Sequence, residues 1–509
     1  RGIAHSVGRS PSYLELGFGQ GLTLNIHAAT NSGHFYGTDF NPSQVANAAE
    51  LAAAVGKQVT IWEDSFEDLA ARGDLPQFDI VALHGIWSWV SDETRAAIQS
   101  IARHYLKPGG ILYVSHNILP GWSPMMPLRH LLDEYSRRAA TGGILSRVDQ
   151  SLDFAEKLMS AGASYFKANP GVADRLKAMR KQDRSYVSHE YFNRHWNPET
   201  FASTSDALAE CKLTYAASAS LIDNIDSVAV PPRARPLLAS ISDDVLRETT
   251  RDYVLNQQFR RDLFIKGARR MTAAESAMQF DAMQFLAAGP LDEVPSRVAT
   301  PMGEVNLKPE IYAPLHEALV RQERKPFTLA GLRDRDGLPA LNDVQLREAL
   351  LILCATGHVS PVSDSETPAE DREAARRLNR EICSRARFTG GTQYLAAPVT
   401  GAGVFVNRLQ QLILLAMDEG REDIDKFVWE CFSAQNERLI VEGKTLEGEE
   451  ANRAHIARAR AEFAEKILPT LIAVGAVQAD APFGGHGLVE RRARVAARSV
   501  ARPKPVPAL

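Results

Sequence analysis

Three glycines after an apolar segment are the feature of this sequence from which chemistry can best be inferred. The segment Ser12–Leu16 reads S-Y-L-E-L and runs into Gly17, Gly19 and Gly21. Glycine has no Cβ, so it permits a tight turn and lets the backbone come close to a ligand. Asp39 follows a second apolar segment, 18 residues beyond Gly21, where a carboxylate can accept hydrogen bonds from both hydroxyls of a ribose. The spacing therefore predicts a nucleoside-binding site.

The glycine spacing indicates which nucleoside is bound. A dinucleotide-binding turn has the pattern G-x-G-x-x-G and places a pyrophosphate at the N-terminus of the following helix. This chain has E-x-G-x-G-x-G instead, with Glu15 inside the segment before the turn. That pattern resembles the first motif of class I S-adenosylmethionine-dependent methyltransferases, whose cofactor has no phosphate and carries an amino-acid tail. The resemblance implies S-adenosylmethionine as the cofactor.

Alternating strand and helix patterns must position these residues. Short apolar segments predict strands, and the periodic segments between them predict helices. Repeated strand–helix units form a doubly wound parallel sheet, so we expect an α/β, Rossmann-like fold that binds ligands beyond the carboxyl ends of its strands. The expected strands are Ser12–Leu16, His34–Thr38, Val59–Trp62, Phe78–Leu83 and Ile111–Ser115, and the expected helices are Leu22–Ala29, Pro42–Val55 and Glu93–Tyr105.

Further segments narrow the resemblance. The turn L-K-P-G-G-x-L at residues 106–112 is typical of class I methyltransferases, whereas the [DNS]-P-P-[YFW] motif of amide- and adenine-specific enzymes does not follow Leu83. The segments H-G-x-x-S-W at residues 84–89 and L-P-G-W at residues 119–122 instead resemble bacterial protein-lysine methyltransferases that modify outer-membrane proteins, as do residues 37–42, 188–193 and 262–264. Members of that group carry a methyltransferase regulatory domain after the catalytic one, and we expect the same here.

The resemblance also implies which residues hold the cofactor. They follow the ends of the first four strands, with Asp64 and Phe66 placed at the adenine. The expected cofactor-binding residues are Glu15, Gly17, Phe18, Gly19, Gly21, Asp39, Phe40, Asp64, Ser65, Phe66, His84 and Gly85.

A methyl acceptor needs further groups. A lysine amine, with a pKa of about 10.4 in water, must lose its proton before it attacks, and burial against apolar walls lowers that pKa. Aromatic faces also attract a sulfonium or a methylated ammonium, and histidines beyond the strand ends could take up the proton. A structural histidine and a core tryptophan stay open as alternatives. The catalytic candidates are His84, Trp87, Trp89, His116 and Trp122.

Composition excludes several classes of function. The chain has 509 residues, a net charge of -4 and a pI near 6.4, so it has no general affinity for nucleic acids. Four cysteines without C-x-x-C pairing favour a reducing, cytoplasmic location. No apolar run approaches the ~18 residues of a membrane span. His189 and His195 are six residues apart, too far for the H-E-x-x-H pattern of a zinc site, so we expect no metal.

Composition shifts divide the chain into five expected parts. These are a catalytic domain at residues 1–124, a helical methyltransferase regulatory domain at 125–285, a winged-helix-like module at 286–375, a helical domain at 376–485 and a disordered tail at 486–509. We expect the catalytic domain to be truncated before its first strand. We expect methylation of a protein lysine by direct in-line transfer. Methylation of a small molecule and cofactor sensing without turnover remain alternatives, and oligomerisation stays open.

Overall fold

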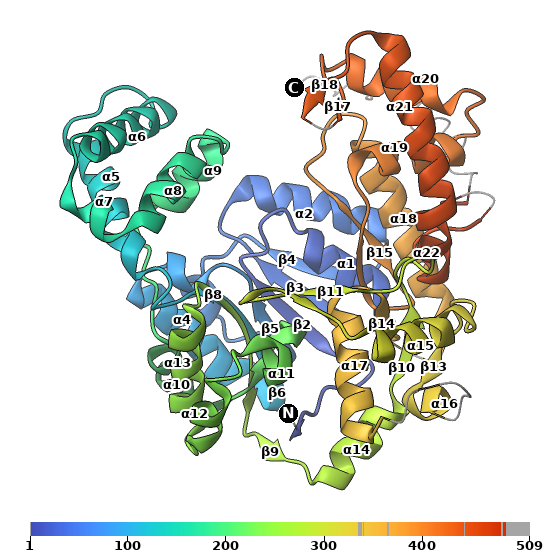
Figure 1. Cartoon of the computed structure of the whole chain (residues 1–509), viewed down its shortest axis with the longest axis horizontal. Helices are drawn as coiled ribbons and strands as arrows, with labels where there is room; N and C mark the ends of the chain where they lie inside the picture. The colour runs from blue at the N-terminus through green and yellow to red at the C-terminus, as the bar shows by residue number, and fades with distance from the viewer. Residues whose placement is uncertain are drawn as a thin grey trace, which may run out of the picture.

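A seven-stranded sheet forms the centre of the protein (Figure 1). The computed structural model describes residues 2–333, 338, 341–363, 366–441, 443–479 and 482–484. The strand order is β4-β3-β2-β5-β6-β8-β7, in which β8 runs antiparallel to both of its neighbours and the other pairs are parallel. The strands are β2 (Ser12–Leu16), β3 (His34–Thr38), β4 (Val59–Trp62), β5 (Phe78–Leu83), β6 (Leu106–Asn117), β7 (Leu213–Ser218) and β8 (Phe259–Lys266).

Helices on both faces of the sheet make the fold doubly wound, as the sequence predicted. Their ends follow local capping signals. Asn41 accepts the N–H of Ser43 at 3.0 Å with Pro42 in the first position of α2, and Ser65 and Ser91 cap the next two helices. These helices are α1 (Leu22–Thr30), α2 (Pro42–Val55), α3 (Phe66–Ala71) and α4 (Asp92–Tyr105). Because parallel strands end at one edge, the loops after β2, β3, β4 and β5 meet there.

A helical lobe is inserted between β6 and β7. It extends away from the sheet in Figure 1 and has its own apolar core, built around Leu132, Leu152 and Leu176. Its helices are α5 (Met126–Arg138), α6 (Ile144–Ser160), α7 (Ser164–Ala168), α8 (Pro170–Met179) and α9 (Arg184–Tyr191).

The chain returns to the sheet after this lobe. Helices α10 (Phe201–Ala209) and α13 (Asp244–Leu255) flank β7 and β8, with the short α11 (Asp226–Ala229) and α12 (Arg235–Ser240) between them. The expectation of a helical region at residues 125–285 is corrected here, because two strands of the catalytic sheet come from it. A boundary at residue 124 would separate β6 from β8, although the two strands pair from Ile111 to Asn117.

A winged-helix-like module follows. Its three-stranded sheet has the order β13-β10-β14 and packs on three helices around Phe285, Leu315 and Leu350. The antiparallel hairpin β11–β12 projects from this module. The elements are α14 (Ala273–Ala282), β10 (Gln284–Ala287), β11 (Arg297–Thr300), β12 (Gly303–Asn306), α15 (Pro309–Val320), β13 (Phe327–Thr328), α16 (Leu329–Arg333), α17 (Asp343–Ala355) and β14 (Val359–Pro361).

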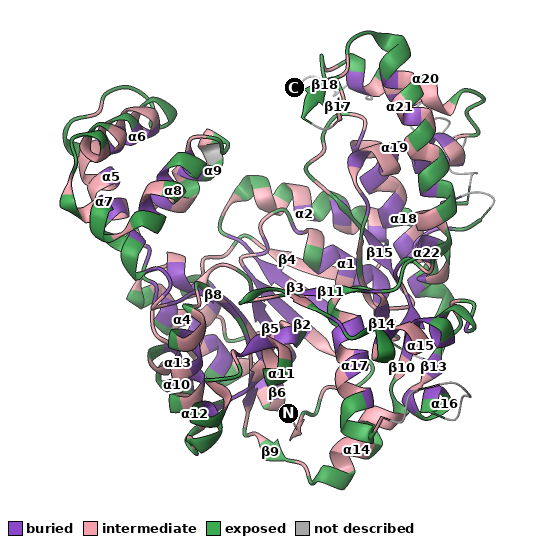
Figure 2. Cartoon of the chain, viewed as in Figure 1, coloured by how far each residue is buried: buried purple, intermediate pink, exposed green. Residues whose placement is uncertain are grey.

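The C-terminal helical domain shares a core with the catalytic domain. Helix α18 packs on α1 and α2, where Lys57 pairs with Asp371 and the guanidinium of Arg377 donates to the carbonyl of Val55 at 2.7 Å. Figure 2 shows the buried residues continuing from the sheet into α18 and β15. The elements are α18 (Ala369–Arg385), β15 (Tyr394–Ala397), β16 (Ala402–Phe405), α19 (Arg408–Asp418), α20 (Ile424–Ser433), β17 (Ile440–Val441), β18 (Lys444–Thr445), α21 (Glu449–Glu462) and α22 (Leu468–Ala473).

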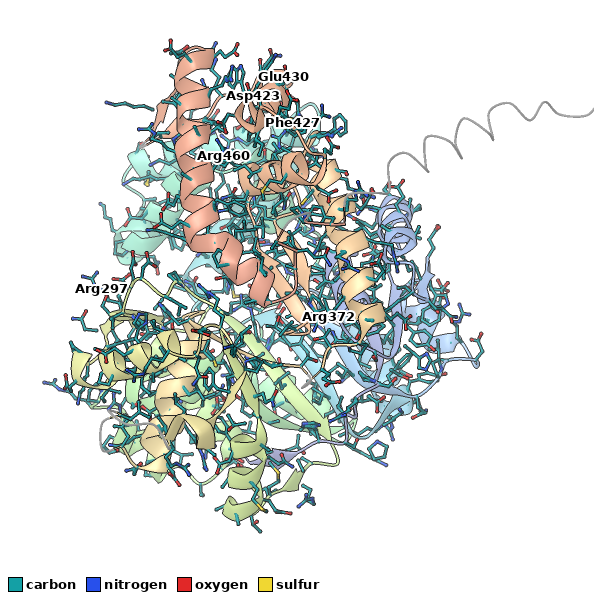
Figure 3. All side chains as sticks on the ribbon, turned by 90° about the vertical axis from the view of Figure 1, so that its right-hand side faces the viewer. Arg297, Arg372, Asp423, Phe427, Glu430 and Arg460 are labelled. Carbon is teal, nitrogen blue, oxygen red and sulfur yellow. The ribbon has the colours of Figure 1, made fainter. Side chains whose placement is uncertain are left out.

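Ion pairs join the helices at the far end of this domain. Arg460 of α21 donates to Asp425 of α20 at 2.8 and 3.0 Å, and Arg453 donates to Asp423 at 2.7 Å. Figure 3 labels Arg460 and Asp423 at this end of the domain. None of the helices that the structure describes is both long and apolar enough to span a membrane. The tail predicted to be disordered, residues 486–509, lies outside the described residues.

Candidate active site

The glycine turn after β2 has the backbone that its sequence predicts. Gly17, Gly19 and Gly21 have φ angles of 69°, 56° and 72°, in the left-handed region that favours glycine. A Cβ on Gly21 would meet the Cβ of Ala48 in α2 at 2.3 Å, whereas a Cβ on Gly19 would meet no atom within 4 Å. The turn therefore packs against the protein on one side and borders open space on another.

Asp39 ties this turn to the end of β3. Its carboxylate accepts the N–H of Gly19 at 2.9 Å and that of Asn41 at 3.0 Å, and the side chain is buried. Each bond uses a different oxygen, so lone pairs on both oxygens stay available to a ligand. This is the arrangement needed to receive two ribose hydroxyls.

A cavity of about 300 Å³ opens beside Asp39. Its size is in the range of small-molecule sites, and no lysine or arginine is among its lining residues, as suits a cofactor without phosphate. Six residues predicted from the sequence line it, namely Gly17, Asp39, Phe40, Asp64, Ser65 and Phe66. Seven others complete the lining: Glu67, Ile86, Trp89, Val90, Ser91, Thr94 and His195.

The loop after β4 and the start of α3 form one wall of the cavity. Ser65 caps α3 by accepting the N–H of Asp68 at 3.1 Å, which fixes the start of that helix. Phe66 in its first turn lines the cavity, and Phe40 on the other side is 76% exposed. Asp64 pairs with Arg72 at 2.9 Å, so one of its oxygens is already engaged. Two aromatic rings beside a carboxylate can hold an adenine by stacking and hydrogen bonding.

Six predicted cofactor residues lie outside the lining of this cavity. Two of them are Gly19, whose N–H donates to Asp39, and His84, which follows β5. Phe18 is a core side chain packed against α1 and Gly37, which corrects its assignment as a ligand contact. Gly21 caps α1. Gly85, with a φ of 65°, borders open space. Glu15 is buried in β2, where it accepts the hydroxyl of Tyr13 at 3.0 Å, and burial raises its pKa to about 7.

His84 forms a polar cluster at the carboxyl end of β5. Its Nδ1 lies 2.8 Å from the hydroxyl of Tyr113 and 3.1 Å from Oγ of Ser115, and its ring is stacked on Tyr113. Ser115 in turn accepts the N–H of Gly85 at 2.8 Å. Phe259 of β8 packs edge-on at 6.4 Å from the His84 ring. The cluster joins three strands beside the glycine turn.

The environment of His84 favours its neutral form. Burial lowers its pKa, and the positive charge of Arg261 lowers it further. Among the described residues, no carboxylate lies within 4.0 Å of Arg261, whose guanidinium stacks over Phe259. Any cation brought to this cluster meets the same repulsion, so the cluster disfavours a protonated amine.

His116 and Trp87 are both buried and lie outside the cavity lining, so their catalytic roles stay predictions. His116 is fully buried, 3.3 Å from Asp262, within an ion network centred on Arg260. It lies on the opposite face of β6 from Tyr113 and Ser115, because side chains alternate along a strand. Trp87 is buried in the core and donates to Glu199 at 3.1 Å.

The remaining tryptophans connect the cavity to the helical lobe. Trp89 lines the cavity and lies 6.2 Å from Trp196, which packs perpendicular to Trp122 at 5.1 Å. Trp122 is buried in the core of the lobe and does not line the cofactor cavity, and its catalytic role stays a prediction. Trp89 stays a candidate pocket wall.

Several residues of the site were missed by the sequence analysis. Tyr113 and Ser115 lie in a strand whose end was identified, and alternation along it could have indicated them. Phe259, Arg261 and His195 come from distant segments, next to residues 262–264 and 188–193 that carry the family resemblance, but no pattern singled them out for the site. The placement of Phe259 and Arg261 requires the register of β8 against β6, in which Arg261 pairs with Ser115.

Fold and site together define the class of protein. A sheet of this strand order, a glycine turn and a buried carboxylate at adjacent strand ends are those of a class I S-adenosylmethionine-dependent methyltransferase. Two family models agree: one described as "Methyltransferase domain" matches residues 14–112, and one described as "Predicted methyltransferase regulatory domain" matches residues 183–266.

A relative that aligns over nearly the whole chain shows the family. An uncharacterized protein of Synechocystis sp. is 36% identical over 466 residues, which cover 91% of each chain. The protein therefore belongs to a family of S-adenosylmethionine-dependent methyltransferases that carry a methyltransferase regulatory domain. An uncharacterized protein of Rickettsia prowazekii is 27% identical over 268 residues, 49% of this chain and 45% of that one.

The fold is also found in a solved structure. PKMT2 from Rickettsia typhi, in complex with AdoHcy, superposes with a TM-score of 0.65 at 19% identity and covers 90% of this chain and 94% of its own. The shared fold extends through the winged-helix-like and C-terminal parts, since so much of both chains is matched.

Proposed function

We propose that this enzyme methylates the side-chain amine of a lysine in a protein substrate. The observation that carries the proposal is the cluster of His84, Tyr113 and Ser115 beside Arg261. S-adenosylmethionine supplies the electrophilic methyl group in such reactions. The protein must present an acceptor without its proton, in line and away from water.

The cluster suits an amine for electrostatic reasons. The hydroxyls of Tyr113 and Ser115 are neutral hydrogen-bonding partners, so they can hold an uncharged amine without stabilising its protonated form. The charge of Arg261 raises the cost of a second cation there, as its effect on the pKa of His84 shows. A lysine entering this site would have its pKa lowered by the same physics.

His84 can take up the proton that the amine releases. This requires Nδ1–H to donate to Tyr113 or Ser115, which leaves the lone pair on Nε2. The resemblance of residues 84–89 and 119–122 to protein-lysine methyltransferases supports a protein substrate.

The test is to incubate the enzyme and methyl-tritiated S-adenosylmethionine with a desalted bacterial lysate. We expect label in protein, and peptide mass spectrometry should locate added CH₂ units on lysine. Label confined to the small-molecule fraction would contradict the proposal, as would cofactor binding without any labelled product.

A further inference from the structure

A second cavity lies between the helical lobe and the catalytic sheet. Its volume is about 670 Å³, more than twice that of the cofactor cavity. One wall is helix α8, including its first turn, and the opposite wall is formed by the loop after β6 and the turn before β8. The cavity is therefore built by both parts of the molecule.

A turn that lines the second cavity leads directly into a strand of the His84 cluster. Gln258 lines it and immediately precedes Phe259, whose ring packs on His84. The carbonyl of Gln258 accepts the N–H of Ile118 at 3.0 Å, which holds this turn against the end of β6. The same backbone turn therefore borders the second cavity and supports Phe259 of the cluster.

Arg175 supplies the positive charge in this cavity. It is the one basic residue among the lining residues, and its guanidinium lies 4.2 Å from the centre of the Trp122 ring. It donates to the hydroxyl of Tyr191 at 3.1 Å and to Oε1 of Gln258 at 3.1 Å, both of them neutral acceptors. In the described part of the chain, no carboxylate lies within 4.0 Å of it.

Two acidic groups near Arg175 do not neutralise it. Asp174 lines the cavity, but its side chain is 80% exposed and lies 3.6 Å from Lys177. Glu190 of α9 interacts with Arg175 only at longer range, and burial raises the pKa of that carboxyl despite the attraction. The first turn of α8 adds the positive end of a helix dipole. The cavity is thus prepared for an anionic group.

We infer that the second cavity binds an acidic stretch of the protein substrate, with a carboxylate of that stretch on Arg175. The inference rests on the proposed function, because it takes the occupant to be the chain that carries the target lysine. Met125, Val172 and Met179 offer apolar contact to the same segment.

Two matched synthetic peptides test this inference. Each has one central lysine, flanked on both sides by three glutamates in one peptide and by three glutamines in the other. Their affinities for the full chain, saturated with S-adenosylhomocysteine, are measured by fluorescence anisotropy. The wild-type chain should bind the glutamate peptide about tenfold more tightly or better.

Variants on α8 test which residue causes the preference for the glutamate peptide. Arg175→Gln should bring the two affinities within about twofold, whereas Arg175→Lys keeps the charge and should keep most of the preference. Lys177→Gln removes the same charge from an exposed position on the same helix, outside the cavity, and should leave the preference unchanged. Unaltered affinity for S-adenosylhomocysteine verifies that each variant is folded.

Equal affinities for both peptides in the wild-type chain, or an undiminished preference in Arg175→Gln, would overturn the inference. Methyl transfer to the peptide lysines is read separately by mass spectrometry. Transfer without a charge preference overturns only the role of Arg175. The wild-type chain could prefer the glutamate peptide, and lose that preference in Arg175→Gln, while no lysine is methylated in peptides or lysate. That result would support the anion site and contradict the proposed function.

Discussion

Replacing Glu15 by glutamine should make cofactor affinity independent of pH near neutrality. Glu15 is 6% exposed and accepts the Tyr13 hydroxyl, and burial raises its pKa from 4.5 to about 7. The resemblance to methyltransferases makes this carboxylate a cofactor-binding residue, and the amino-acid tail of the cofactor carries an ammonium group. We take that ammonium group to be the one nearest Glu15. A cation there favours the ionised carboxylate, so cofactor binding should expel the proton from Glu15.

The magnitude follows from proton linkage. If the bound cofactor returns the pKa of Glu15 from about 7 to about 4.5, binding at pH 7 releases about 0.5 proton. Below pH 7 the free protein holds the proton and binding must displace it, so affinity rises with pH and levels off above 7. Affinity at pH 8 should exceed that at pH 6 by about tenfold.

Calorimetry measures both quantities. Titrations of S-adenosylhomocysteine at pH 7 in buffers of different ionisation enthalpy give the number of protons released, and titrations at pH 6 and pH 8 give the affinity ratio. Glu15→Gln keeps an acceptor for Tyr13 and should show neither effect. Glu67→Gln removes an exposed carboxylate from the cavity lining and should retain both. A wild-type chain with no proton release and a flat pH dependence would refute the reasoning.

Three further predictions concern the site and its support. Asp39→Ala should weaken S-adenosylhomocysteine binding by about 10- to 150-fold, since hydrogen bonds to a charged group contribute about 1.5–3 kcal/mol; unchanged affinity by calorimetry would exclude its ribose contact. His84→Gln should lower kcat by about 100-fold in the tritium assay without changing cofactor affinity, and a wild-type kcat would remove His84 as proton acceptor. Lys57→Met removes the ion-pair partner of the nearly buried Asp371 and should destabilise the domain contact by about 3–5 kcal/mol. Denaturant unfolding should show this loss of stability, and the double variant Lys57→Met/Asp371→Leu should recover it. Equal stability of the single variant and the wild type would contradict the prediction.

The N-terminal fold could be predicted because its signals are local. Strands β2 to β5 and helix α2 have the predicted bounds, since apolar runs, the Asn41–Pro42 cap and glycine turns each depend on a few neighbouring residues. Strand β6 begins five residues earlier than expected, at Leu106, because the L-K-P-G-G segment is part of the strand and not a separate turn before it. The cofactor cavity followed from the same local signals.

The acceptor side could not be predicted in the same way, because it depends on pairing between distant strands. The sequence analysis placed both His84 and His116 beyond strand ends. Their surroundings differ, however, according to the face of the sheet on which each side chain lies. Along β6, Tyr113 and Ser115 point toward His84, whereas His116 points into the ion network with Asp262. The register with β8 fixes that choice, and nothing near residue 116 encodes it.

This dependence explains why the regulatory region is not separable from the catalytic site. Strand β8 lies within the segment matched as the regulatory domain, yet it supplies Phe259 and Arg261 to the His84 cluster. The lobe inserted between β6 and β7 is held by Trp196 against Trp89 at the cofactor cavity. A movement of the lobe that shifts β8 would therefore change the charge around the acceptor and the shape of the cofactor cavity together. The regulatory region and the catalytic site therefore share one sheet and cannot be divided at the bounds of the two family models.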